Sequence, residues 1–240
     1  ELVKGGADIA VHSLKDLPTF QPKELILGAV LPRDSFYDIL ILNPGIYTNN
    51  KFTKKLLNLG ATIGTSSVRR QAQLLNIRPD LKFVSIRGNV KTRINKLIDD
   101  GLDAIIMAEA GIRRLNIENI KYFRIPVSIS VPAVGQGTIA IEIRKDSEFL
   151  SMIKKINHKN TYLCSLSERA FLTYLGAGCQ DPAGALAQIK NNKIYITGVI
   201  ASTDGTKIIR KNQSGKISEP EKIGNILAKK LVQSGGVINN

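Results

Sequence analysis

The sequence contains few cysteines, few aromatic residues and no long apolar run. Its 240 residues include only Cys164 and Cys179, too few for a disulfide framework and typical of a reducing compartment. No stretch reaches the roughly 18 uncharged apolar residues that a membrane-spanning helix needs. The first residues do not resemble a signal peptide. We therefore expect a cytoplasmic protein that does not associate with membranes.

Aromatic residues make up 5% of the chain, whereas basic residues are abundant. The formal net charge is +14, and residues 51–100 hold eleven Lys or Arg against three Asp or Glu. This balance indicates an anionic partner. Nucleic-acid-binding proteins usually add aromatic platforms or a reader motif, and the sequence shows neither. It therefore favours a small anion, with a basic nucleic-acid-binding protein as a weaker alternative.

Histidine is also scarce. His12 and His158 have no partner at metal-ligand spacing, so no metal site is predicted.

The apolar pattern predicts an α/β fold for most of the chain. Strands at about 8–11 and 25–30 precede a region, 61–126, in which strands and helices alternate, as in a mostly parallel sheet covered by helices. A strand at 138–143 follows. Helices are expected at 146–156 and 160–175, three antiparallel strands at 183–189, 193–201 and 207–211, and a last helix at about 219–233. The change to clustered strands predicts a separate α+β domain after about residue 158.

Two predicted helix starts carry arginine, at residues 65–70 (TSSVRR) and 87–93 (RGNVKTR). A helix N-terminus offers free backbone N–H groups and the positive end of the helix dipole. Arginine adds a planar fork that fits a carboxylate or a phosphate. Each start alone is an ordinary capped helix. Because both follow strands of one parallel sheet, they are expected at the same end of it, where they favour a shared polyanion site.

Two further stretches carry chemistry, although each also has an ordinary interpretation. Residues 12–16 (HSLKD) follow a strand, so they form either a catalytic loop or a solvated strand end. Asp16 as a lone carboxylate suits a reaction that develops positive charge. Cys179 lies in a turn between Gly176 and Pro182, so it is either a small loop residue, a buried thiol or a covalent attachment point.

Five motifs in order resemble those of the porphobilinogen deaminase (hydroxymethylbilane synthase) family. They are residues 8–19 (DIAVHSLKDLPT), 64–71 (GTSSVRRQ), 87–93 (RGNVKTR), 131–137 (VPAVGQG) and 176–182 (GAGCQDP). The resemblance covers nearly the whole chain and weakens after about residue 202.

The resemblance implies a transferase of tetrapyrrole and haem biosynthesis. It implies that Cys179 holds a dipyrromethane cofactor through a thioether. Four porphobilinogen molecules are then added head to tail, each with loss of ammonia, and water releases hydroxymethylbilane. Asp16 would stabilise the azafulvenium cation that forms when ammonia leaves, orient the rings and move protons. Cys164, inside a predicted helix, is interpreted as a packing residue.

The resemblance also implies which residues bind the carboxylates of the cofactor and of the growing chain. Backbone contacts are expected from Gln136 and Gly137. The remaining binding residues are Ser13, Lys15, Thr65, Ser66, Ser67, Arg69, Arg70, Arg87, Gly88, Arg93 and Arg114.

For the architecture, the resemblance implies two lobes like those of periplasmic binding proteins, followed by the α+β domain. Residues 1–31 with 138–157 would form the first lobe, 37–131 the second and 158–240 the third domain, with crossovers near 32–36 and 132–137. The family normally begins with a strand and helix that carry a Gly-Thr-Arg-like segment, and this sequence begins after that point. We therefore expect the first lobe to be incomplete and to expose a sheet edge and apolar surface, and both an active and an inactive chain are compatible with this.

The main alternative is a non-catalytic, two-lobed binding protein for an anionic small molecule. It would share the fold and the arginines but would need neither Cys179 nor Asp16. The family resemblance favours the enzyme, acting as a monomer on porphobilinogen without a nucleic-acid partner.

Overall fold

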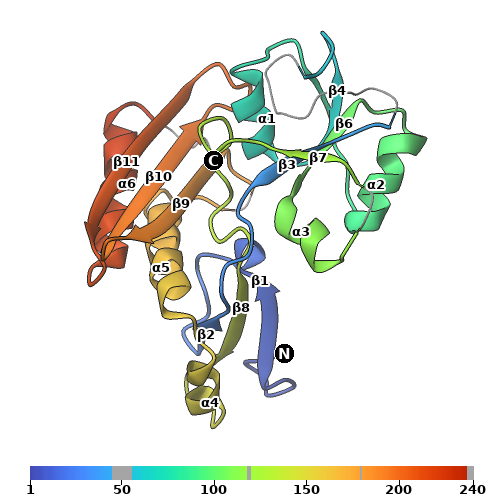
Figure 1. Cartoon of the computed structure of the whole chain (residues 1–240). Helices are drawn as coiled ribbons and strands as arrows, with labels where there is room; N and C mark the ends of the chain where they lie inside the picture. Colours follow the sequence, from blue (N-terminus) through green and yellow to red (C-terminus); the bar gives the residue numbers. More distant parts are fainter. Residues whose placement is uncertain (45–55, 118–119, 179, 237–240) are drawn as a thin grey trace.

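The fold consists of three sheets, each packed against helices (Figure 1). The computed structural model describes residues 1–44, 56–117, 120–178 and 180–236. Within these ranges no helix has the length and apolar character needed to cross a bilayer.

The first sheet is antiparallel and has the order β1-β8-β2. Its strands are β1 (Ile9–Ser13), β8 (Ile139–Arg144) and β2 (Leu25–Val30), so the chain returns to this sheet after a long excursion. Helix α4 (Leu150–Lys155) packs Ile153 against Ala29 and Ile143. On the edge strand β1, Ile9 and Val11 are 41% and 63% exposed.

The second sheet has the order β5-β4-β6-β3-β7. Four of its strands run in one direction, and β3 runs antiparallel to both of its neighbours. The expectation of a mostly parallel sheet is therefore confirmed, but the sequence did not predict β3 or β7. Its strands are β3 (Asp38–Leu42), β4 (Thr62–Gly64), β5 (Lys82–Val84), β6 (Ala104–Ala108) and β7 (Tyr122–Arg124).

Helices cover both faces of this second sheet. Leu74 of α1 (Val68–Leu75) joins one apolar cluster, which also contains Leu40 and Ile106. Leu97 of α2 (Val90–Asp99) and Ile112 of α3 (Glu109–Arg114) join the other. Because successive residues of β3 and β6 enter opposite clusters, these strands are apolar throughout rather than alternating.

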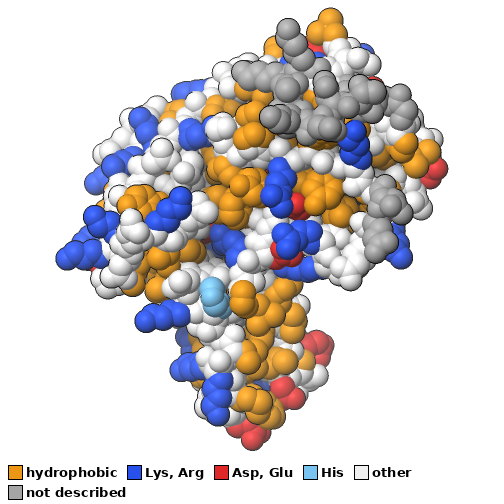
Figure 2. All heavy atoms as spheres, in the orientation of Figure 1, with side chains coloured by type: hydrophobic (Ala, Val, Ile, Leu, Met, Phe, Trp, Pro, Cys, Tyr) orange, Lys and Arg blue, Asp and Glu red, His pale blue; other side chains and the backbone are white. Residues whose placement is uncertain are grey.

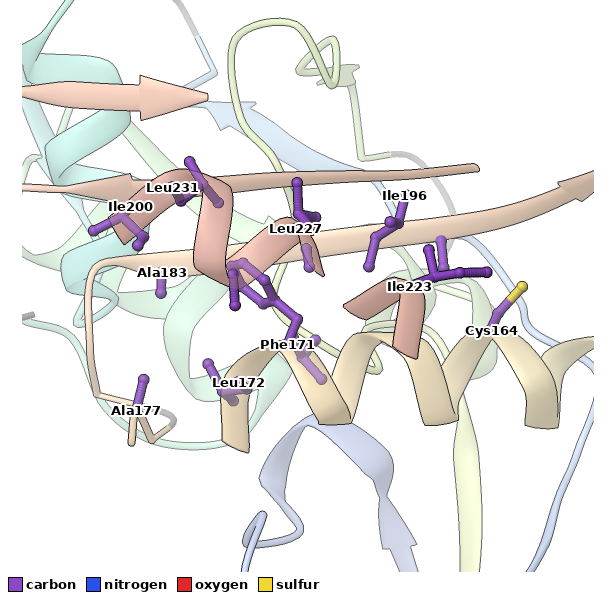
Figure 3. Packing of buried hydrophobic residues seen from close by; sticks show 14 of the residues in the cluster. Cys164, Phe171, Leu172, Ala177, Ala183, Ile196, Ile200, Ile223, Leu227 and Leu231 are labelled. Atoms are coloured by element: carbon purple, nitrogen blue, oxygen red, sulfur yellow. The ribbon is translucent and has the colours of Figure 1, made fainter. Parts of the chain in front are cut away.

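The third sheet is antiparallel, in the order β11-β10-β9. Its strands are β9 (Ala183–Lys190), β10 (Lys193–Ala201) and β11 (Ile208–Lys216). Asn191 and Asn192 form the turn between β9 and β10, and both have positive φ. The last strand extends to Lys216, beyond the predicted end at 211. Helices α5 (Lys159–Tyr174) and α6 (Pro220–Gln233) bury Phe171, Leu227 and Leu231 against one face (Figure 3).

Two segments connect the first sheet to the second, and they lie side by side. The backbone N–H of Asp34 donates to the Gly137 carbonyl at 2.9 Å, and that of Leu31 donates to Ile139 at 3.0 Å. Gly137 has a φ of +83°, and any Cβ on it would overlap the Ser35 carbonyl group. Only glycine fits this close approach of two backbones.

The α/β fold with a C-terminal three-stranded antiparallel sheet is confirmed. The three sheets use strands from 9–30 with 139–144, from 38–124 and from 183–216. The domain boundaries themselves stay a prediction.

Candidate functional site

A cleft lies where the three sheets meet, and we call it the main cleft. Its volume is about 210 Å³. It takes Lys15 and Asp16 from the first sheet, and residues from the starts of α1 and α2, among them Arg70 and Arg93. The third sheet's side contributes Gly178, Gln180, Asp181 and Ala183. Figure 2 shows Lys and Arg side chains around the middle of the face on which the sheets converge.

A second hollow of about 260 Å³ adjoins the main cleft, and we call it the side pocket. Lys15, Asp16, Arg70 and Arg93 line both hollows, so the two share one basic wall. The side pocket adds four predicted binding residues, Ser13, Gly88, Arg114 and Gly137.

Asp16 reaches the cleft because its neighbours hold the loop in place. Residues Leu14–Asp16 form a 3₁₀ turn directly after β1. Leu14 and Leu17 are buried at 1% and 4% exposure, and Leu14 packs on Gly135, where a Cβ would lie 2.6 Å from its Cγ. The apolar side chains point into the protein, which leaves the Asp16 carboxylate exposed on the cleft side. The buried leucines on either side therefore fix the position of Asp16 at the cleft, and its catalytic role stays a prediction.

His12 lies outside both hollows. Its Nε2 is 3.0 Å from Oε2 of Glu142 on the neighbouring strand, so it takes part in a cross-strand pair. Among the described residues, no group of three or more His, Cys, Asp or Glu side chains is arranged to hold a metal ion.

Lys15 faces the same basic wall as the arginines. Burial lowers the pKa of Lys15 from its ordinary value, and the positive charge of Arg70 lowers it further. Asp16 and Asp38 act in the opposite direction. The cleft thus holds several cations close together. A polyanionic ligand would reduce the repulsion between their charges.

The two helix starts behave differently, although the sequence gives both a polar cap. Asn89 caps α2 by accepting a hydrogen bond from the Thr92 N–H at 2.9 Å. Ser67 stands at the same position before α1, but its side chain makes no capping bond and instead lines the main cleft. The first turn of α1 is therefore open toward the cleft, as an anion-binding helix start requires.

The neighbouring polar residues divide between the cleft and the protein interior. Ser66 lines the main cleft and donates to the Ile86 carbonyl at 2.6 Å. Thr65 is 1% exposed and does not line either hollow, and its hydroxyl accepts from the Ser67 N–H at 3.3 Å. Arg87 is exposed and also lies outside both linings. Their ligand contacts stay predictions.

Arg69 and Arg70 line the main cleft but are already paired within the protein. Both are buried, at 4% and 6% exposure, and both contact Asp38 at 2.8 Å. Burial alone would raise the pKa of Asp38, but the two guanidinium groups outweigh it and hold this pKa well below its usual range. Asp38 is therefore ionised, and it was not among the predicted site residues.

Residues 130–137, which lead the chain back to the first sheet and which we call the return segment, contribute Gln136 and Gly137. The Gln136 side chain is buried and donates to the Phe36 carbonyl at 2.7 Å, so it is already engaged within the protein. Arg114 donates to the Gly137 carbonyl at 2.9 Å and so fixes this turn beside the side pocket.

Cys179 lies outside the described residues, but both of its neighbours line the main cleft. Gly178 donates its N–H to Oδ2 of Asp181 at 2.6 Å, which ties this turn together. Cys164, by contrast, is packed in the α5/α6 cluster (Figure 3), and burial raises its pKa to about 12. A thiol with so high a pKa is unreactive near neutral pH, so the interpretation of Cys164 as a packing residue is confirmed.

Comparison with known families now decides the assignment. The family model "Porphobilinogen deaminase, dipyromethane cofactor binding domain" matches residues 1–152, and "Porphobilinogen deaminase, C-terminal domain" matches residues 162–233. The chain belongs to the porphobilinogen deaminase family.

Individual family members are similar over nearly the whole chain. The porphobilinogen deaminase of Desulforamulus reducens is 46% identical over 95% of this chain and 72% of its own length. That of Pelotomaculum thermopropionicum is 43% identical over 98% of this chain and 73% of its own length. Among solved structures, an ancestral cationic amino acid solute binding protein superposes with a TM-score of 0.43 at 14% identity, covering 65% of this chain and 64% of its own.

In this porphobilinogen deaminase family member, one ion pair ties the two connecting segments to α5 and the third sheet. Arg33, in the first connecting segment, makes two bonds to Glu168 of α5, at 2.7 and 3.0 Å. Glu168 is fully buried and also accepts from the N–H groups of Gly135 and Ala187, each at 2.7 Å. The pair therefore fixes the return segment and β9 to each other. Neither residue was singled out from the sequence.

Proposed function

We propose that this chain catalyses the polymerisation of porphobilinogen, as the names of its relatives indicate. Four porphobilinogen molecules and one water give hydroxymethylbilane and four molecules of ammonia. The reaction makes the protein a transferase of tetrapyrrole biosynthesis. The observation that carries the proposal is the convergence of Asp16, the arginine-bearing helix starts and both neighbours of Cys179 on the main cleft.

The donor set of the cleft suits a chain of pyrroles, because each ring carries an acetate and a propionate. Lys15, Arg70 and Arg93 line both hollows, and the open start of α1 adds backbone donors. The side pocket continues the same basic wall, so further rings of the growing polyanion would have space and positive charge beside the main cleft. These residues would hold the carboxylates, and the half-buried Ser67 hydroxyl, which lines the main cleft, would supplement them.

The described residues around the cleft also fit a dipyrromethane, which carries the same carboxylates. We propose Cys179 as its attachment point, since Gly178 and Gln180 line the cleft and Cys164 is buried elsewhere. When bound, the dipyrromethane supplies the nucleophilic pyrrole carbon from which the chain grows. The protein's part is to anchor it and to orient its carboxylates along the basic wall.

Asp16 would stabilise the positive charge that develops during the reaction. When the aminomethyl C–N bond of porphobilinogen breaks, the substrate carbon skeleton becomes cationic. A carboxylate held beside it lowers the free energy of that charge, and in a cleft it acts more strongly than in bulk water. The same oxygens can accept pyrrole N–H bonds and hold the two reacting rings in line. Two acidic residues line the main cleft: Asp181 accepts the Gly178 N–H within its own turn, whereas Asp16 also lines the side pocket, which favours Asp16 for this role.

A non-catalytic binding protein for an anionic small molecule is the second candidate. It would use the basic wall but has no use for a carboxylate that projects into it, and the family assignment does not favour it. A monomeric state is part of the proposal.

Turnover separates the two functions. On incubation with porphobilinogen, we expect the wild-type protein to release one ammonia for each porphobilinogen consumed and one hydroxymethylbilane for every four. The Cys179→Ser variant should still bind porphobilinogen but release no hydroxymethylbilane, whereas Cys164→Ser should behave as the wild type. Binding of porphobilinogen by the wild-type protein with no release of ammonia would support the binding protein instead.

A further inference from the structure

Asp38 is the most heavily hydrogen-bonded carboxylate beside the main cleft, and the mechanism above does not use it. It is the first residue of β3 and is fully buried. Two bonds come from Arg69, to Oδ2 at 2.8 Å and to Oδ1 at 3.3 Å, and one comes from Arg70 Nε to Oδ1 at 2.8 Å. Ser130 donates to Oδ2 at 2.8 Å and Gln136 to Oδ1 at 3.1 Å. One carboxylate thus holds the start of α1 and both ends of the return segment.

The two arginines on Asp38 differ in what else they contact. Arg69 also donates to the Ser130 hydroxyl at 3.3 Å and to the Val131 carbonyl at 2.6 Å, so its donors are directed into the protein. Arg70 makes only long further contacts, at 3.3 Å to the Ile106 carbonyl and 3.4 Å to Gln136 Oε1, and it lines both hollows. These contacts indicate that the Arg69 guanidinium is structural, whereas the Arg70 guanidinium can turn toward a ligand.

We infer that Asp38 is a positioning residue. As the counter-anion of both arginines, it holds Arg69 in its contacts within the protein and orients the Arg70 guanidinium toward the carboxylates of the ligand. This inference rests on the proposed function. Two adjacent guanidinium groups repel each other, and a shared carboxylate removes that repulsion. Without it, Arg69 and Arg70 would be left buried and uncompensated, which is the costly way to break an ion pair. The ligand carboxylates would then face an Arg70 guanidinium that is charged but wrongly oriented.

Removal of the Asp38 charge should therefore damage ligand positioning as well as stability. An Asn at position 38 keeps one acceptor oxygen but turns an NH₂ group toward the guanidinium groups. In Asp38→Asn we expect kcat/KM for porphobilinogen to fall about a hundredfold, the size of effect that misplaced binding groups can produce. KM should rise, because Arg70 no longer meets the substrate carboxylate in place. A purely structural role would reduce the amount of active protein and leave KM unchanged.

Asp80→Asn is the matched control. Asp80 also accepts two bonds from one arginine, Arg78, both at 2.6 Å, but it lies at the surface and lines neither hollow. This variant should keep the wild-type KM and kcat. If the wild type and Asp80→Asn both fail to consume porphobilinogen, the proposed function is wrong, whereas a folded Asp38→Asn with the KM of an active wild type contradicts only the role of Asp38.

A second variant adds a readout that does not depend on turnover, the unfolding temperature. Asp38→Ala leaves a space that formate can fill with the missing carboxylate. Formate should raise the unfolding temperature of Asp38→Ala well above its effect on Asp80→Ala, and neutral formamide should not. In the folded Asp38→Ala protein, formate should also lower KM toward the wild-type value. Equal effects of formate on the two alanine variants would overturn the inference.

Discussion

Asp16→Asn is expected to reduce kcat for hydroxymethylbilane formation by about a hundred- to a thousandfold, the range found when one electrostatic stabiliser of a transition state is removed. The amide is nearly the same size as the carboxylate, so the 3₁₀ turn anchored by Leu14 and Leu17 should stay in place. What is lost is the negative charge beside the cationic carbon. The measurement is the steady-state rate of porphobilinogen consumption, with circular dichroism as a check on folding.

Two controls sharpen the Asp16 prediction. Asp146→Asn removes an exposed carboxylate just after β8, outside both hollows, and should leave kcat unchanged. Attachment of the dipyrromethane should survive in Asp16→Asn if only later steps need the charge, and the intact mass of the variant reports this. Wild-type kcat in a folded Asp16→Asn protein would remove Asp16 from the mechanism.

Glu168→Gln should have the largest effect on stability. Glu168 is fully buried, and its two oxygens accept four bonds, from Arg33 and from the backbone of Gly135 and Ala187. Glutamine has the same shape but replaces one oxygen with an NH₂ group that would face N–H donors, and it leaves Arg33 buried without its anion. Breaking a buried pair in this way costs about 3–5 kcal/mol of unfolding free energy. Urea titration of the wild type and the variant measures the loss.

The surface pair of Glu219 and Lys222 provides the comparison for Glu168. Its atoms approach to 2.8 Å, as closely as the buried pair, but both side chains are largely exposed. Glu219→Gln should therefore leave the urea midpoint unchanged, because solvent screens an exposed pair. A Glu168→Gln protein with the wild-type midpoint would show that Arg33 and Glu168 do not stabilise the packing of the connecting segments against α5 and β9.

Local pattern was enough to predict most of the elements. The run Leu25–Val30 gives β2 with its observed bounds, and the apolar periodicity of 90–98 gives α2. The strand β3 was missed because Ile39–Leu42 is apolar on both faces and so lacks the alternation that marks a half-buried strand. Its antiparallel direction depends on pairing with β6, more than sixty residues away, which no local pattern encodes.

The site was predictable to the extent that it follows from topology. The carboxyl ends of parallel strands meet at one sheet edge, which is why the starts of α1 and α2 could be assigned to one site. The partner of the arginines was not predictable, since Asp38 precedes Arg69 by 31 residues in the chain. The only local signal was a charged residue immediately before four apolar ones. The open cap at Ser67 likewise depends on the turn geometry, not on residue type.

The intact mass of the purified protein, measured beside Cys179→Ser and Cys164→Ser, tests the central claim most directly. We expect an excess mass equal to two linked pyrrole units in the wild type and in Cys164→Ser, and no excess in Cys179→Ser. An excess that persists in Cys179→Ser, or a wild-type protein that stays unmodified after incubation with porphobilinogen, would contradict attachment of the dipyrromethane at Cys179.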